Sequence, residues 1–150
     1  MKSEPDEVSI DDLEAAPDQR LAWFGVRNYQ ARNFMRDAMQ VGDLAFFYHS
    51  SCAELGIAGI CEVCSEPYQD ATQFAERGPY FDPKSTPENP RWWLRDVHFV
   101  AKSRLIPLAE LRLHAELANM RLLARGNRLS IMPVTADEWL FITKELMGRQ

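Results

Sequence analysis

The chain has 150 residues, 46% of them hydrophobic and 26% charged, with a formal net charge of −5 at pH 7. This length predicts one domain over residues 1–150 with a core that needs no disulfide bonds, and the composition excludes a disordered, collagen-like or coiled-coil chain. The acidic balance disfavours a protein that coats DNA by neutralising its phosphates.

The expected compartment follows from sequence signals that the chain lacks. It has no run of about 18 apolar residues that would form a membrane-spanning helix. Its acidic first seven residues contain no apolar core of the kind found in secretory signals. Its three cysteines, an odd number, do not suit a disulfide framework. We therefore expect a cytoplasmic protein in a reducing compartment, with no membrane partner.

Strands and helices are predicted to alternate along the chain. Residues that favour helix N-termini mark five helical starts: Ser9, Asn28, Asp70, Pro107 and Thr135. Apolar runs or polar–apolar alternation predict five strands: residues 21–24, 44–49, 56–63, 91–103 and 129–134. The glycines of the strand at 56–63 indicate that another segment packs closely on it. Helices inserted between strands favour an α+β fold with an antiparallel or barrel-like sheet over a doubly wound one.

One long loop stands out between these elements. Residues 78–90 contain four prolines, which exclude a central strand or a long helix there. A loop of this length inside a compact domain is more often functional than not.

Positive charge is concentrated in two places on the acidic chain. Residues 20–36 contain four arginines and no acid, and residues 121–134 contain three arginines and no acid. Two local basic patches suit a small anionic target better than a long duplex. The alternative is a set of separate, solvated arginines.

Known catalytic and cofactor motifs are missing from the sequence. Cys61 and Cys64 form a C-x-x-C pair, but no second pair and no suitably spaced histidines follow to complete a zinc site. On a strand, two residues three positions apart also point to opposite faces. No phosphate-binding loop, dinucleotide fingerprint or nucleophile elbow occurs. We therefore expect no metal and no cofactor.

The end of the strand at 44–49 is a candidate pocket rim. Alternation places Phe47 and His49 on one face of this strand and Phe46, Tyr48 and Ser50 on the other. A histidine followed by two hydroxyl side chains could contact a ligand. A histidine that is merely hydrogen-bonded at a strand end is the alternative.

The segment from Trp23 to Arg36 carries the strongest functional signal. An exposed Trp23 beside Gly25 would let a planar ligand approach the backbone, and the helix N-terminus beside Arg27 would attract an anion. Asn28, Arg32 and Arg36 are spaced four residues apart and would share one helix face. Ring stacking, an amide and an anion site together suit a nucleotide. A Trp23 buried in the core is the alternative.

These residues also carry a family resemblance that extends along nearly the whole chain. The sequence resembles the EVE domain family in segments that include Met1–Pro5, Gly25–Asn33, Phe46–Ser50, Gly56–Gly59, Tyr80–Ser85, Asn89–Trp92, Pro107–Leu111 and Arg128–Ile131. It departs from the usual family pattern at Ser51, where asparagine is common, and at Leu55, where proline is common. More loosely, Lys2, Ser3, Trp23 and residues 46–59 are similar to YTH domains, which read methylated adenine in RNA.

The resemblance implies a PUA-like fold, a small mixed β-barrel surrounded by short helices. It also implies a non-catalytic reader of modified bases, with modified cytosine in DNA favoured and RNA possible as the partner. From the resemblance and the residue patterns together, the base-binding residues are expected to be Lys2, Ser3, Trp23, Gly25, Val26, Asn28, Phe47, His49, Ser50 and Ser51. The phosphate-binding residues are expected to be Arg27, Arg32 and Arg36.

Two other functions remain open at this point. A hydrolase or glycosylase could act on a modified nucleoside, with His49 as acid or base and Glu4 or Asp82 as its partner. A general RNA-binding PUA-like module that senses no modification is the second alternative. Competition between modified and unmodified oligonucleotides separates that module from a reader.

Overall fold

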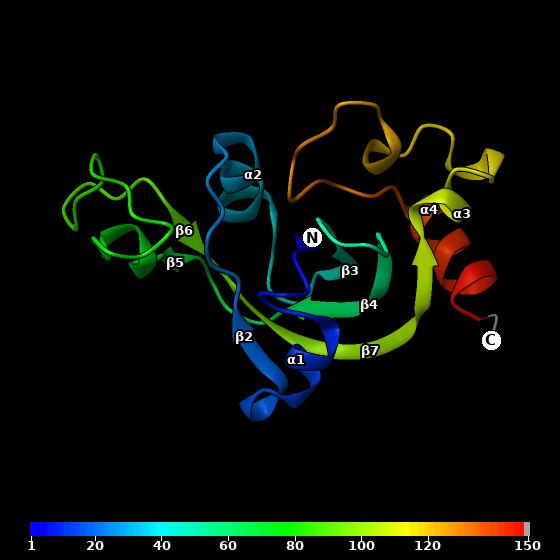
Figure 1. Ribbon diagram of the computed structural model, residues 1–150, viewed down its shortest axis with the longest axis horizontal. Coiled ribbons are helices and arrows are strands. Elements are labelled where there is room, and N and C mark those ends of the chain that lie inside the picture. Colours follow the sequence, from blue (N-terminus) through cyan, green and yellow to red (C-terminus); the bar gives the residue numbers. More distant parts are fainter. Residues whose placement is uncertain (149–150) are drawn as a thin grey trace.

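A computed structural model describes residues 1–148, and a curled sheet of five strands forms its centre (Figure 1). The strands lie in the order β1–β3–β4–β7–β2, with β1 parallel to β3 and the other neighbours antiparallel. Their bounds are Lys2–Ser3 (β1), Arg20–Ala22 (β2), Leu44–His49 (β3), Gly56–Val63 (β4) and Asp96–Pro107 (β7). β7 curves along the base of the sheet, which closes into a half-barrel. A separate two-stranded sheet joins β5 (Tyr68–Gln69) to β6 (Trp93–Leu94).

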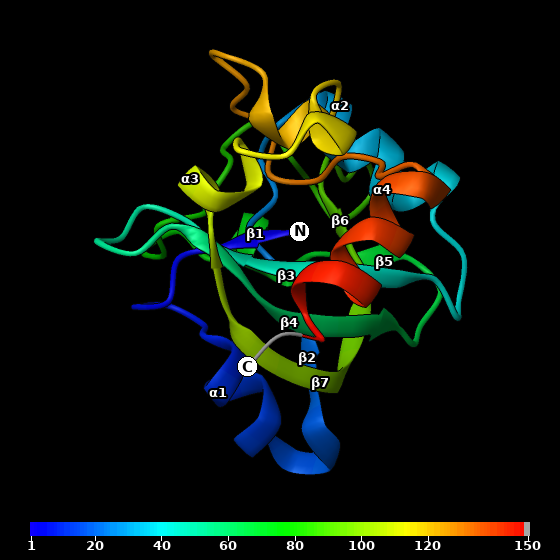
Figure 2. The same ribbon diagram turned by 90° about the vertical axis from the view of Figure 1, so that its right-hand side faces the viewer.

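Short helices surround the half-barrel, as the end-on view in Figure 2 shows. The α-helices are α1 (Ile10–Ala15), α2 (Tyr29–Asn33), α3 (Leu108–Leu111) and α4 (Ala136–Phe141). α2 and α4 continue into the π-helical turns η2 (Phe34–Ala38) and η6 (Ile142–Leu146). Single 3-10 turns occur at η1 (Pro17–Gln19), η3 (Ala71–Phe74), η4 (Ala115–Leu117) and η5 (Arg121–Leu123). Within residues 1–148, none of these helices has the length and apolar character needed to cross a bilayer.

The predicted helix starts are confirmed in detail. Ser9 and Thr135 each form a capping box, and the side chains of Asn28 and Asp70 cap the elements that follow them. Pro107 occupies the N-cap position of α3 instead of the first helical position. The α+β class is therefore confirmed, with its helices placed by local capping chemistry.

Two predicted strands differ from the structure. The strand expected over 91–103 is divided between β6 and β7 at Arg95, whose buried guanidinium donates to the backbone carbonyls of Met35 and Met39. Arg95 belongs to neither strand: its side chain bonds to the end of the π-helical turn, and its backbone carbonyl accepts from the N–H of Trp23. Residues 129–134 form no strand, because Pro133 lacks an N–H and the N–H of Leu129 donates to a side chain.

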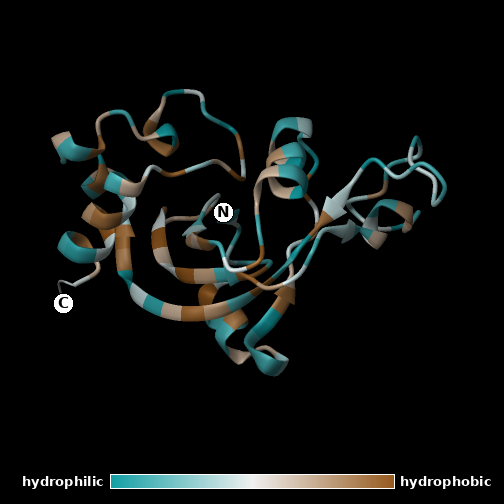
Figure 3. Ribbon diagram, turned by 180° about the vertical axis from the view of Figure 1, so that it is seen from behind, coloured by the Kyte–Doolittle hydropathy of each residue, from teal (hydrophilic) through white to brown (hydrophobic). Residues whose placement is uncertain are grey.

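The two faces of β3 contribute to two different core clusters. Phe47 packs in a cluster with Leu13, Trp23 and Met35, whereas Phe46 and Tyr48 pack with residues beneath α3, α4 and η6. Figure 3 shows hydrophobic and hydrophilic residues interspersed along the long curved strands β4 and β7. The predicted alternation of this strand is confirmed, and both of its faces are buried.

The glycines of β4 are required by close backbone packing. A Cβ atom at Gly56 would lie 2.3 Å from the carbonyl oxygen of Ile106, and one at Gly59 would lie 2.4 Å from that of Ala101. At these two positions β7 therefore lies closer to β4 than a residue with a Cβ atom would allow, as the sequence predicted.

Candidate nucleic-acid interface

A pocket of about 400 Å³ opens beside β1, and side chains of the core cluster around Phe47 line it. Its walls come from the N-terminal segment, from the chain after β2, from the end of β3 and from loop 78–90. Eight of the ten residues expected to bind a base line this pocket: Lys2, Ser3, Trp23, Gly25, Val26, Phe47, Ser50 and Ser51. The residues expected from the resemblance and the sequence patterns thus largely share one pocket, although the role of each residue in binding stays a prediction.

Two aromatic rings form the floor of the pocket. Trp23 and Phe47 meet edge to face, with ring centroids 5.5 Å apart and an interplanar angle of 82°. Trp23 is 9% exposed, which corrects the expectation of an exposed tryptophan. Its backbone N–H donates to the carbonyl of Arg95, which fixes the chain just after β2. Trp23 is therefore both a core residue and part of the pocket floor, so the two interpretations of the sequence are compatible.

Tyr80 closes the pocket from the proline-rich loop. Gly25 has a φ of +84°, and a Cβ atom there would lie 2.8 Å from the Tyr80 ring. The Tyr80 hydroxyl donates to Glu7 at 2.5 Å, and the ring meets Phe24 edge to face. Burial and the neighbouring carboxylate raise the pKa of Tyr80 to about 12. The four prolines of this loop marked it as functional, but no local signal singled out Tyr80.

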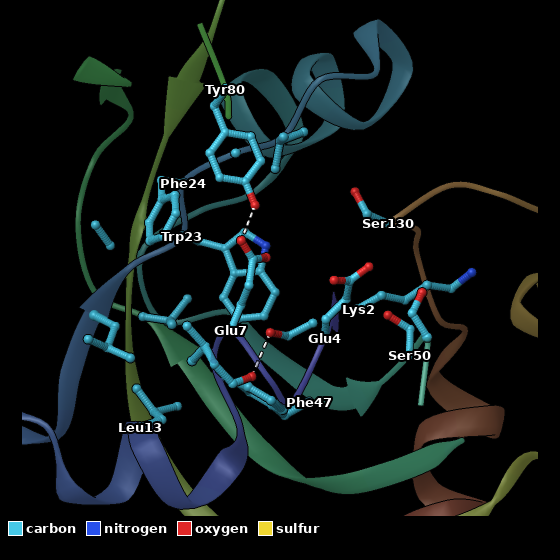
Figure 4. Close-up of a pocket in the computed structure, with 18 of the residues that line it drawn as sticks. Lys2, Glu4, Glu7, Leu13, Trp23, Phe24, Phe47, Ser50, Tyr80 and Ser130 are labelled. Atoms are coloured by element: carbon cyan, nitrogen blue, oxygen red, sulfur yellow. Dashed lines mark hydrogen bonds between the residues drawn. The ribbon is translucent and has the colours of Figure 1, made fainter. Parts of the chain in front are cut away.

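The rim of the pocket is polar and carries both signs of charge. Lys2, Ser50 and Ser130 lie to the right of Trp23 in Figure 4, Glu4 lies between them and Trp23, and Glu7 extends up to the Tyr80 hydroxyl. The backbone N–H of Ser50 donates to the carbonyl of Ser3, which ties the end of β3 to β1. Burial lowers the pKa of Lys2.

The other two residues expected in the pocket lie elsewhere. The Asn28 side chain is exposed and accepts a hydrogen bond from the N–H of Ala31 as the cap of α2. His49 accepts from the N–H of Ile10 through Nε2 at 3.1 Å and lines a separate hollow with Asp11. Burial lowers the pKa of His49. Asn28 therefore caps α2, and His49 joins the end of β3 to the start of α1; a binding role for either stays a prediction.

The three arginines expected to bind phosphate have acceptors within the chain. Arg27 donates to the buried carboxylate of Asp70 and to the carbonyl of Tyr80. Arg32 donates to the carbonyl of Arg91 and to its neighbour Asn33, and Arg36 pairs with Asp37. Arg36 lies in the π-helical turn after α2, which breaks the regular spacing that would align it with Asn28 and Arg32. Their assignment to phosphates stays a prediction.

Aromatic rings further hold two of these arginines. Tyr29 and Trp92 stack with centroids 4.8 Å apart, and the Arg32 guanidinium lies over the Tyr29 ring at 4.7 Å. The guanidinium of Arg27 lies 5.3 Å from the centroid of Trp92. These cation–π contacts join α2 to the segment after loop 78–90. Sequence reasoning missed this cluster because its members are about sixty residues apart.

The groups of the enzymatic alternative do not meet in the pocket. Glu4 lines the pocket, but His49 faces the other hollow and Asp82 accepts a hydrogen bond from Nε1 of Trp92. Burial raises the pKa of the Cys61 thiol to about 11, and Cys64 is half-buried. Among residues 1–148, no group of three or more His, Cys, Asp or Glu side chains is placed to hold a metal ion.

Comparison with known proteins points to one family. The EVE domain profile matches residues 1–145. The chain is 48% identical to human thymocyte nuclear protein 1, covering 95% of this chain and 70% of the human protein. The chicken protein is 46% identical, with coverage of 95% and 65%.

Solved structures agree with this assignment. A crystal structure of human THYN1 in complex with 5-methylcytosine-containing DNA has a TM-score of 0.88 at 48% identity, covering 95% of this chain and 92% of that one. A crystal structure of a Pseudomonas syringae protein has a TM-score of 0.91 at 46% identity, covering 95% of each chain. These similarities confirm the PUA-like fold class. The chain belongs to the EVE domain family.

Proposed function

We propose that this protein is a non-catalytic reader of a modified nucleobase and that its favoured ligand is modified cytosine in DNA. The observation that carries the proposal is a pocket with an aromatic floor and a polar rim. It occurs in a chain that is 48% identical to a protein solved in complex with 5-methylcytosine-containing DNA. A base inside a duplex is inaccessible to such a pocket, so the target base would be flipped out of the helix or unpaired.

The floor of the pocket suits the ring and the methyl group of the base. Stacking of a base on an aromatic side chain contributes about 1–3 kcal/mol, and Trp23 and Phe47 provide the aromatic surface. Leu13 and Val97 also line the pocket and provide apolar surface for a methyl group at C5 of cytosine.

The rim suits the polar edge of cytosine. Cytosine carries an exocyclic amine that donates hydrogen bonds, and a glutamate carboxylate is a matching acceptor. Glu4 and Glu7 are the carboxylates on the rim, and Ser50 and Ser51 add hydroxyl groups. Thymine has the same C5 methyl group as 5-methylcytosine but a carbonyl in place of the amine, so this rim would disfavour it.

Three labelled oligonucleotides of one sequence test the proposal. They carry a single 5-methylcytosine, cytosine or thymine at the same position, and the dissociation constant of each is measured by fluorescence anisotropy. We expect the methylcytosine strand to bind most tightly and the thymine strand to be rejected despite its methyl group. Equal affinities for the three strands would exclude the reader function. An RNA version of the methylcytosine strand tests the DNA preference.

The non-catalytic part of the proposal has its own test. Purified protein is incubated with modified nucleosides and oligonucleotides, and the products are separated by chromatography. We expect unchanged substrate, because the pocket does not contain His49 or Asp82. Release of a free base or a deaminated product would show a glycosylase or a hydrolase instead.

A further inference from the structure

A segment with three arginines borders the pocket on the side away from α2. Arg128 lines the pocket, and Arg121 and Arg125 are exposed on the same segment. Within residues 1–148, the guanidinium groups of these three arginines make no hydrogen bond, ion pair or ring contact. They contrast with the arginines around α2, whose donors are already occupied by acceptors of the chain.

The backbone of this segment is held in place before any ligand binds. Gly126 turns the chain with a φ of +74°. The Asn127 side chain donates to the carbonyl of Arg121 and accepts from the N–H of Leu129 at 2.9 Å. The arginines therefore extend from a defined turn, and a ligand would have to order only their side chains.

β1 brings a fourth cation to the same edge. The backbone N–H of Lys2 donates to the carbonyl of Ser130 at 2.8 Å, which places Lys2 beside the arginine segment. In Figure 4 the Lys2 side chain extends toward the strip of chain that carries Ser130. Its ammonium group makes no ion pair within the described residues, and burial alone lowers its pKa. A partly desolvated cation without a carboxylate partner favours the arrival of an anion.

The position of this edge matches the path of a nucleic-acid strand. Figure 1 shows residues 121–130 and α2 at the same end of the molecule, on opposite sides of the N-terminal strand. A strand whose base enters the pocket must carry its phosphates past the rim, where Lys2 and Arg128 line the pocket without an acceptor for their charged groups among residues 1–148. The acidic remainder of the chain would repel phosphates elsewhere.

We propose that Lys2, Arg125 and Arg128 form a basic rim that binds the phosphates next to the base held in the pocket. The inference rests on the proposed reader function and adds the surface that holds the DNA backbone. Phosphate contacts position a strand without reading its sequence. The basic rim therefore supplies affinity, and the pocket supplies the preference for the modified base.

The salt dependence of binding tests the basic rim. The double variant R125Q/R128Q and the wild type are titrated with the methylcytosine and cytosine single strands at several salt concentrations. Each lost phosphate contact reduces the slope of log K against log salt by roughly 0.7. We expect the slope to fall by about 1.4 for two contacts, with the ratio of affinities for the two strands unchanged. Lys2→Gln should lower the slope by about half as much.

A matched control removes the same charge from another surface. R20Q/K102Q deletes two cations that pair with Asp96 and Asp11 beside α1 and η1. Its slope should equal that of the wild type. A wild-type slope in R125Q/R128Q, or an equal fall in the control, would overturn the basic rim. A wild type that binds the methylcytosine and cytosine strands equally would instead exclude the reader function. The salt slopes measured with the cytosine strand would still test the basic rim in that case.

Discussion

Two segments of this chain are rich in arginine and free of acid, but their arginines have different surroundings. In residues 20–36, Arg20, Arg27, Arg32 and Arg36 all donate to acceptors of the protein. In residues 121–128, the arginines make no such contact within the described chain. The arginines of the first segment therefore already have acceptors within the fold, and those of the second are available to a ligand.

The difference shows why a count of charges cannot separate a structural arginine from a binding one. Arg20 and Asp96 are 76 positions apart, and Arg27 and Asp70 are 43 positions apart. No local pattern around either arginine reveals the partner that folding brings to it. An arginine is a candidate for ligand binding only after its donors have been matched with acceptors in the fold.

Trp23→Ala should have the largest effect within the first segment. Trp23 is almost fully buried against Phe47, so its loss should lower the free energy of unfolding by about 3–5 kcal/mol. The folded fraction should also bind the methylcytosine strand more weakly by about 1–3 kcal/mol. Thermal unfolding and a fluorescence titration measure the two effects.

Trp23→Phe is the control and should retain part of the stability and part of the affinity. Normal binding by the folded Trp23→Ala protein would remove Trp23 from the pocket.

Arg27→Gln should destabilise the protein more than any arginine substitution in the second segment. Asp70 is fully buried, and it would lose the cation that balances its charge. Breaking a buried pair costs about 3 kcal/mol or more, and denaturant unfolding measures the loss. Arg125→Gln is the matched control and should change stability by less than about 0.5 kcal/mol. Equal stabilities for the two variants would show that the segments do not differ in this way.

Much of the fold was predictable because its signals are local. The capping boxes at Ser9 and Thr135 and the strands at 44–49 and 56–63 depend on residues adjacent in sequence. The break at Arg95 was not predictable, because it depends on helix carbonyls about sixty positions away.

In the candidate site, too, the residues marked by local patterns were predictable and those placed by distant segments were not. Trp23, Gly25 and Phe47 stood out through ring, turn and strand patterns, and the structure brings them together. The sequence did not reveal that Tyr80 closes the pocket or that Arg128 lies on its rim. Tyr80 reaches the pocket through the long loop 78–90, and Arg128 belongs to a segment far from the other lining residues in sequence. His49 was misplaced because hydrogen bonding to Ile10 turns it toward a different hollow.

Arg32→Ala should have a moderate effect on stability and none on the salt slope. The substitution removes a hydrogen bond to the carbonyl of Arg91 and the contact over the Tyr29 ring. The net cost of such a hydrogen bond is about 1 kcal/mol, which chemical denaturation can resolve. A slope of log K against log salt that falls by roughly 0.7 would instead assign Arg32 to a phosphate. That outcome would give the first segment a binding role as well.

Asn28→Asp should have the smallest effect and gives the finest test of the first segment. Aspartate caps a helix as well as asparagine does, so the cap of α2 and the melting temperature should be preserved. The substitution also removes an amide donor and adds a negative charge. If Asn28 only caps the helix outside the pocket, the preference for methylcytosine over cytosine should be unchanged, with at most a small, salt-sensitive loss of affinity for both strands. If Asn28 reads the base edge, the preference itself should fall while the melting temperature holds. Measuring both strands at two salt concentrations distinguishes these outcomes, because screening weakens the effect of an added charge and does not restore a lost hydrogen bond.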